Sequence, residues 1–216
     1  MDRITLITSD AVRVVGNYYK GSADRGALLV HMMPATKESW DVFARVLEKR
    51  GYHVLAIDMR GHGESDGGPA GYKDFSDEEH QRKIQDVAAG AAFLSSQGVA
   101  QENLIVIGAS IGANLCLQYL AEHPFVTRGV FLSAGLSYRG VNAEEYVGNL
   151  HPGQRVLLAT SEDDRVQGNA EMNQTLYALV PVGVPKKLLV YHHAGHGTDM
   201  FGKEEPNLEK EILTWL

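Results

Sequence analysis

Short apolar runs alternate along the chain with segments in which apolar residues recur every three or four positions. Runs without polar alternation are typical of strands covered on both faces by helices. These runs are Gly26–His31, His53–Asp58, Asn103–Gly108, Gly129–Ala134, Arg155–Thr160 and Lys187–Tyr191. Two earlier β-rich runs, Ile4–Ile7 and Val12–Tyr19, are separated by a short polar link. They predict an antiparallel pair at one edge of a sheet.

Helical spacing appears between these runs. Residues 40–47 predict a core-facing helix that stops at Gly51. Ser76 and Glu79 have the spacing of a capping box, and they open a long helix whose apolar face continues to Leu94. Further helices are predicted from Ser110 to the region of Pro124, around Met172–Leu179, and over Leu208–Leu216 with a start at Pro206.

Strands that alternate with helices need crossover connections, which produce a parallel sheet with helices on both faces. The sequence therefore predicts an α/β protein with a mostly parallel sheet of about seven or eight strands. No repeat, low-complexity tract or linker divides the chain, so residues 1–216 are expected to form a single domain. Ligands of such sheets bind beyond the carboxyl ends of the strands.

Composition narrows the classes of function. The chain has 44% hydrophobic and 22% charged residues, as globular proteins do, and a net charge of −7 disfavours nucleic acid as a ligand. The single cysteine, Cys116, cannot form an internal disulfide and is expected to be a buried packing residue. No segment has the pattern of a signal peptide or a membrane span, so we expect a cytoplasmic protein without membrane contact.

The sharpest chemical signal is the corner between the run ending at Gly108 and the helix that follows. Gly108-x-Ser110-x-Gly112 is the pattern of a nucleophile elbow, a turn so tight that side chains at the glycine positions would collide with the backbone. Such a turn presents Ser110 at the carboxyl edge of the sheet and points a helix N-terminus at the same place. Ser110 is therefore the candidate nucleophile.

A serine nucleophile needs a base and a third group that orients the base. Three acids, Glu162, Asp163 and Asp164, directly follow one predicted strand, and a histidine-rich segment, residues 192–197, follows the last. The order serine, acid, histidine is the order that the elbow motif predicts.

With these residues in place, the chain resembles the α/β-hydrolase family, in particular its small lidless members similar to dienelactone hydrolases and bacterial carboxylesterases. The resemblance covers nearly the whole chain and implies the α/β-hydrolase fold without a large lid domain. The matching segments are Leu29–Trp40, Asp58–Ser65, the Gly-x-Ser-x-Gly corner, Ser161–Val166 and Gly195-His-Gly197.

The family pattern places the triad acid on Asp164, ahead of Arg165 and Val166, rather than on Asp163. His196 is the expected base because its glycine-flanked loop lets the ring reach Ser110, whereas His192 and His193 still belong to the strand end. A metal site on these three histidines is the alternative, and it lacks the helical spacing that places imidazoles on one face. No metal and no cofactor are expected.

The oxyanion loop departs from the family pattern, which has a glycine where this chain has Met32. By position, the backbone N–H groups of Met33 and Ile111 are the expected oxyanion donors. Met32 and Met33 are either apolar packing or, with their flexible thioethers, part of an adaptable substrate pocket.

Larger relatives insert a helical lid between Gly135 and Arg155. Here the connection has room for only a short helix and loops. An open site is therefore expected, with Tyr138, Tyr146 and Leu150 as candidate walls, and an open apolar rim is compatible with a homodimer.

The resemblance implies a serine hydrolase, foremost a carboxylesterase that cleaves esters with small or medium acyl groups through an acyl-enzyme. Thioesterase, lactone hydrolase and peptidase activities use the same triad and stay open as alternatives. An alternative of another class is a ligand-binding or receptor module with little turnover, because a fold does not fix a function.

Overall fold

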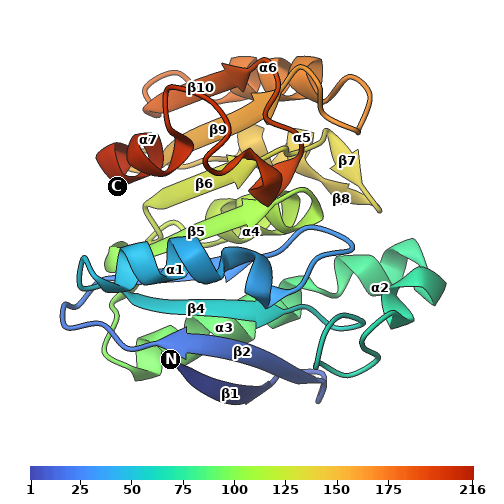
Figure 1. Cartoon of the computed structure of the whole chain (residues 1–216), viewed down its shortest axis with the longest axis vertical. Helices are drawn as coiled ribbons and strands as arrows, with labels where there is room; N and C mark the ends of the chain where they lie inside the picture. The colour runs from blue at the N-terminus through green and yellow to red at the C-terminus, as the bar shows by residue number, and fades with distance from the viewer.

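An eight-stranded sheet forms the centre of the computed structural model, which describes all residues from 1 to 216. Its strand order is β1-β2-β4-β3-β5-β6-β9-β10, and β2 runs in the direction opposite to that of the other strands (Figure 1). The predicted antiparallel pair at the edge and the parallel sheet are both confirmed. The strands are β1 Asp2–Ile7, β2 Arg13–Tyr19, β3 Gly26–Val30, β4 His53–Asp58, β5 Leu104–Ala109, β6 Arg128–Leu132, β9 Arg155–Ser161 and β10 Lys186–Tyr191.

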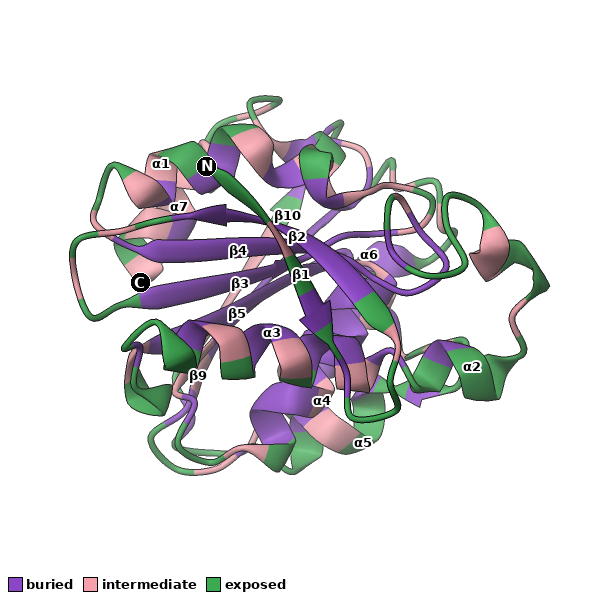
Figure 2. Cartoon of the chain, turned by 90° about the horizontal axis from the view of Figure 1, so that it is seen from below, coloured by how far each residue is buried: buried purple, intermediate pink, exposed green.

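Helices cover both faces of this sheet (Figure 2). One face carries α1 Asp41–Glu48 and α7 Leu208–Trp215, and the other carries α3 Ile84–Ser96, α4 Ile111–Glu122, α5 Ala143–Gly148 and α6 Asn169–Leu179. The last helix starts one residue after its cap, Asn207, whose side chain accepts a hydrogen bond from the N–H of Lys210. The start predicted at Pro206 is therefore wrong, because the polar side chain of Asn207 supplies the cap.

Two hydrophobic cores follow from the alternation of side chains along the strands. In β3, Leu28 and Val30 belong to the core under α3 and α4, while Ala27 and Leu29 belong to the core under α1 and α7. All four are completely buried. The unbroken apolar runs of the sequence therefore predicted strands that are covered on both sides.

The helix predicted from the capping box is split in two. The capping box of Ser76 and Glu79 is present and starts α2, Asp77–Gln81, and α3 begins only at Ile84. At the break the backbone hydrogen bonds span three residues rather than four, as in the bond from the N–H of Lys83 to His80 O. At this break the Lys83 side chain is completely buried.

The connection after β6 holds a short hairpin, β7 Ser137–Tyr138 and β8 Val141–Asn142, followed by α5. This agrees with the expected short helix and leaves no large lid. The hairpin and α2 lie beyond the same end of the sheet (Figure 1). They meet through Arg139, whose guanidinium is 3.9 Å from the carboxylate of Asp77. No helix of this fold has both the length and the apolar character that a membrane crossing requires.

Candidate active site

Ser110 occupies the corner between β5 and α4 in a strained backbone conformation. Its φ of 54° and ψ of −124° lie in a region that residues with a side chain rarely adopt. The Ser110 N–H donates to Leu132 O at 2.8 Å, which ties the corner to the end of β6. The side chain is half-buried, so the hydroxyl is within reach of a ligand.

The two glycines of the motif are required by close backbone contacts. A Cβ at Gly108 would lie 2.2 Å from Gly112 O, inside the corner itself. A Cβ at Gly112 would lie 2.5 Å from Val30 O and 2.6 Å from His31 O. The elbow therefore packs directly against the end of β3, where the Met32–Met33 loop begins.

Gly112→Ala is expected to destabilise the fold by on the order of 3 kcal/mol, because the new methyl group would meet rigid backbone rather than a movable side chain. Urea unfolding measures the change. Gly148→Ala is the matched control, since a Cβ there meets nothing within 4 Å and its φ is not positive. The control should be neutral or slightly stabilising, and an equal loss in both variants would contradict the close-approach argument.

The three acids after β9 have three different partners. The Glu162 carboxylate contacts His192 Nδ1 at 2.8 Å on the surface. Asp163 accepts from the Ser161 hydroxyl at 2.6 Å and from the Gly195 N–H at 2.9 Å, and the bond from Ser161 is the main reason that its pKa is lowered. Asp163 thus ties the acid loop to the histidine loop.

Asp164 and His196 form a buried pair. The Nδ1 atom of His196 lies 2.6 Å and 2.8 Å from the two carboxylate oxygens of Asp164, and the side chains are only 2% and 1% exposed, respectively. Asp164 also accepts the Val166 N–H at 2.8 Å. This contact fixes the imidazole with Nδ1 protonated and leaves Nε2 as the basic nitrogen.

The histidine loop lies beside the elbow. A Cβ at Gly197 would be 3.2 Å from the Cβ of Ala109, the residue before Ser110. No hydrogen bond joins the Ser110 hydroxyl to His196, whose ring contacts Asp164 through Nδ1. Hydrogen bonds of this kind are often long before a substrate binds.

Ser133 is a supporting residue that the sequence did not single out. It follows β6, has a φ of 50°, and is buried. Its hydroxyl accepts the Gly197 N–H at 2.9 Å and so anchors the loop next to His196. In the sequence it is one ordinary serine at a strand end, with no motif around it.

The predicted oxyanion donors have the free N–H groups that the role requires. Neither the Met33 N–H nor the Ile111 N–H donates to an acceptor in the protein. His31 holds the Met32–Met33 loop in place. Its Nδ1 contacts Met32 O at 2.8 Å, and its Nε2 accepts the Met59 N–H at 3.0 Å. Burial lowers the pKa of His31 to about 4, so the imidazole stays neutral.

Met32 belongs to the core under α1 and α7. It is 6% exposed, and a Cβ at Gly197 would lie 2.7 Å from its sulfur. The Met32 side chain packs between the end of β3 and the histidine loop, and its role in a substrate pocket stays a prediction. Met33 stays half-buried.

The two tyrosines predicted as pocket walls differ in position. The Tyr138 hydroxyl accepts from the Asn169 side chain at 2.9 Å, and burial followed by the charge of Asp164 raises its pKa to about 12. Its pocket role stays a prediction. Burial and the charge of Glu122, at the far end of α4 from Ser110, raise the pKa of Tyr146. Helix α5 packs against α4, and the place of Tyr146 at the site stays a prediction.

Leu150 is a buried core residue, and its role as a wall of the site stays a prediction. The three histidines proposed as alternative metal ligands do not form one ligand set, since His192 and His193 are exposed and His196 points inward to Asp164.

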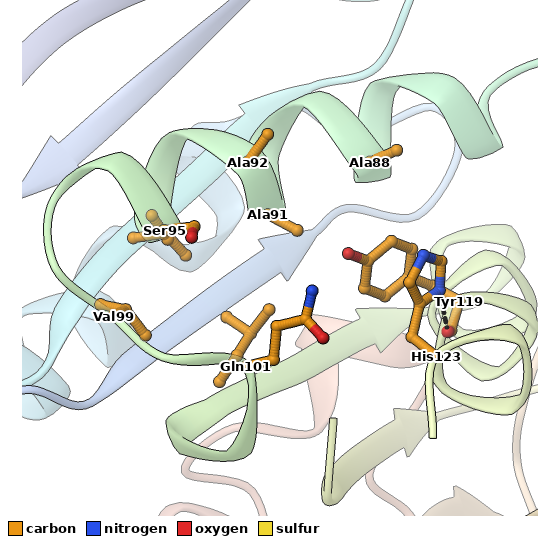
Figure 3. Close-up of a pocket in the computed structure, with 10 residues that line it drawn as sticks. Ala88, Ala91, Ala92, Ser95, Val99, Gln101, Tyr119 and His123 are labelled. Carbon is orange, nitrogen blue, oxygen red and sulfur yellow. Dashed lines mark hydrogen bonds between the residues drawn. The ribbon is translucent and has the colours of Figure 1, made fainter. Parts of the chain in front are cut away.

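A large groove of about 380 Å³ lies away from these residues, between α3 and α4 (Figure 3). It borders Leu104, at the start of β5, whereas Ser110 follows the other end of that strand. The rings of Tyr119 and His123 stack at one side of it, 3.8 Å apart. The groove brings no nucleophile together with a base and an acid. A smaller cavity of about 240 Å³ borders Asp164.

The strained serine corner lies at the same edge of the sheet as the buried acid–histidine pair. The sheet has the strand order given above. The sequence profile of the family described as alpha/beta hydrolase fold matches residues 28–155. The chain belongs to this family. The matched region includes the elbow and ends before Asp164 and His196.

Similar proteins agree with this assignment. A bifunctional esterase/perhydrolase of Acinetobacter calcoaceticus is 31% identical over 132 residues, which are 59% of this chain and 43% of the relative. The alignments with the curated relatives thus span less than half of their length. The structure of DcsB with a substrate analogue superimposes with a TM-score of 0.82 at 16% identity, over 99% of this chain and 98% of the other. The esterase RhEst1 from Rhodococcus gives 0.76 at 19% identity, over 100% and 98%.

Proposed function

We propose that this α/β hydrolase is a serine carboxylesterase that cleaves esters of small or medium acyl groups through an acyl-enzyme intermediate. The observation that carries the proposal is the buried contact of His196 with Asp164 beside a serine held at a positive φ. An acid and an imidazole are costly to bury together in a merely structural role, and such groups concentrate at functional sites.

In the proposed reaction, the Ser110 oxygen attacks the ester carbonyl while His196 Nε2 accepts the hydroxyl proton. The new bond joins the serine oxygen to the acyl carbon, and the bond to the alcohol oxygen breaks as His196 returns the proton to it. Water repeats the sequence and releases the acid. Asp164 holds the imidazole in the required tautomer and stabilises its cation during each step.

The oxyanion of the tetrahedral intermediate would accept from Met33 and Ile111. Both N–H groups lack a protein acceptor, so no existing bond has to break. Donors of this kind contribute about 3 to 4 kcal/mol each to transition-state stabilisation.

The names of relatives favour an ester as the substrate. They include the esterase/perhydrolase of Acinetobacter and a pyrethroid hydrolase of Sphingobium wenxiniae, which is 31% identical over 122 residues. Thioester, lactone and peptide bonds offer the same carbonyl to the same triad. A receptor module that binds ligands without turnover is the competing proposal of another class.

We expect burst kinetics with a chromogenic acetate ester, with one acyl group bound per chain followed by continued turnover. A panel of p-nitrophenyl esters of increasing acyl length, run beside thioesters and lactones, then ranks kcat/KM by bond type and chain length. Faster turnover of thioesters or lactones would replace the ester assignment. A single stoichiometric burst, or thermal stabilisation by ligand without product, would favour the receptor module.

A further inference from the structure

Lys83, at the break between α2 and α3, is a completely buried cation without an acidic partner. Its Nζ atom contacts His80 Nδ1 at 3.0 Å and the Met33 sulfur at 3.8 Å, and it forms no ion pair with a carboxylate. The carboxylate nearest in sequence, Asp86, is occupied by Arg60, with contacts of 2.7 Å and 2.8 Å. Burying an unpaired ammonium group costs folding free energy, so a buried lysine without a carboxylate partner calls for a physical reason.

The other buried lysine of this chain shows what a structural lysine looks like. Lys37 is 2% exposed, and its Nζ atom pairs with Asp58 and Glu38 at 2.7 Å and with Glu64 at 3.0 Å. Three carboxylates offset the cost of burying that charge. Lys83 has no such set, and a role in stability does not account for it.

The remaining contacts of Lys83 lead to the oxyanion loop. Its Nζ atom lies 3.8 Å from the sulfur of Met33 and 5.5 Å from the ring centre of Phe75. Met33 is the residue whose N–H is proposed to bind the oxyanion. The buried ammonium therefore lies one side chain away from the place where negative charge develops.

We propose that Lys83 is a positioning residue of the hydrolytic reaction, which holds the Met33 side chain and whose buried positive charge favours the oxyanion at the Met33 N–H. This inference rests on the proposed esterase function. It does not require contact between Lys83 and the substrate, and the low dielectric of the interior lets the charge act at this range.

The charged groups around Lys83 give this role a pH dependence. Burial lowers the pKa of Lys83 to about 7, with Asp86 opposing the shift and Arg60 and Arg139 adding to it. The ammonium is therefore lost as the pH rises through this value, well below the ordinary titration range of lysine.

The imidazoles that face Lys83 do not titrate in the same range. Burial lowers the pKa of His80 to about 4, and the charge of Lys83 adds to this shift. Burial also lowers the pKa of His31 to about 4 and that of His62 further. All three stay neutral near pH 7, and deprotonation of the proposed base His196 can only raise activity, so a decline of activity with rising pH in this range reports Lys83.

The test is the pH profile of kcat/KM and of the rate of fluorophosphonate labelling in the wild type, Lys83→Met, Lys83→Arg and the control Arg82→Met. Arg82 is the exposed neighbour of Lys83, so its variant should keep the wild-type profile. The wild type should lose activity as the pH rises through about 7. Lys83→Met should be roughly ten-fold slower below that pH and lack the decline. Lys83→Arg should keep its activity at high pH, because arginine does not deprotonate.

The pH dependence of the free energy of unfolding tests whether folding buries Lys83 and lowers its pKa. A lysine whose pKa is lowered on folding binds a proton more readily in the unfolded chain, so stability rises with pH between the folded and the unfolded pKa. The wild type should gain stability relative to Lys83→Met as the pH increases above about 7.

Wild-type rates and a wild-type pH profile in Lys83→Met, with labelling of Ser110 intact, would overturn this inference alone. Absence of both labelling and turnover in the wild-type protein would overturn the proposed esterase function and this inference with it. A lower rate in Lys83→Met with an unchanged pH profile would also overturn it, because a purely structural role gives that result.

Discussion

Replacing Ser110 with alanine should lower ester turnover by a factor on the order of 10⁴ or more, down to the rate left by substrate binding and the oxyanion donors. The nucleophile is lost while the corner keeps its shape, since alanine removes one oxygen atom. A fluorophosphonate probe should no longer label the protein. Turnover of a p-nitrophenyl ester and mass spectrometry of the labelled chain measure the two effects.

Ser133→Ala is the matched control for this experiment. Ser133 also follows a strand and also has a positive φ, and its hydroxyl accepts a hydrogen bond from Gly197. Loss of that bond should loosen the histidine loop and slow the reaction, and the probe should still attach to Ser110. Undiminished labelling of Ser110→Ala, or loss of labelling only in Ser133→Ala, would contradict the assignment of the nucleophile.

The strands and the elbow could be predicted because their signals are local. An apolar run that ends at Gly108 and a helical pattern from Ser110 describe the corner by themselves, and the Cβ positions at Gly108 and Gly112 explain the motif. Strand ends at the same edge of a parallel sheet then bring distant loops together. For this reason chain order predicts that an acid after β9 meets a histidine after β10, and the resemblance to the family implies that this acid is Asp164.

The remaining features depend on contacts between distant segments. Nothing near Met32 in the sequence indicates that its side chain packs against Gly197, and nothing near Lys83 indicates that the helix breaks there. The position of Tyr146 likewise depends on how α5 packs against α4. Such outcomes come from packing across the sheet, which periodicity does not describe.

The roles of the three acids after β9 also depend on contacts with distant segments. Residues 162–164 are three carboxylates in a row, and their separate roles follow from the partners that other loops bring to them. The family pattern favoured Asp164, and its contact with His196 supports that choice on independent grounds. Substitutions at Asp163 and Asp164 can therefore distinguish the roles of two adjacent acids that composition alone does not tell apart.

Asp164→Asn should lower kcat by on the order of 10⁴-fold while the fold is retained. A carboxamide can donate to Nδ1, which favours the tautomer with its proton on Nε2, and that nitrogen can then no longer accept the serine proton. It also fails to stabilise the imidazolium that forms during attack. Labelling by the fluorophosphonate should slow in parallel, because it uses the same proton transfer.

Asp163→Asn is the control, since it differs by one position and carries the same change of charge. Asp163 accepts from Ser161 and Gly195 and does not touch the imidazole, so its loss should affect loop order more than proton transfer. We expect kcat to fall by no more than about ten-fold, the effect of one or two weakened hydrogen bonds. A larger loss in Asp163→Asn than in Asp164→Asn would move the orienting acid to Asp163, and the buried contact with His196 would then be structural.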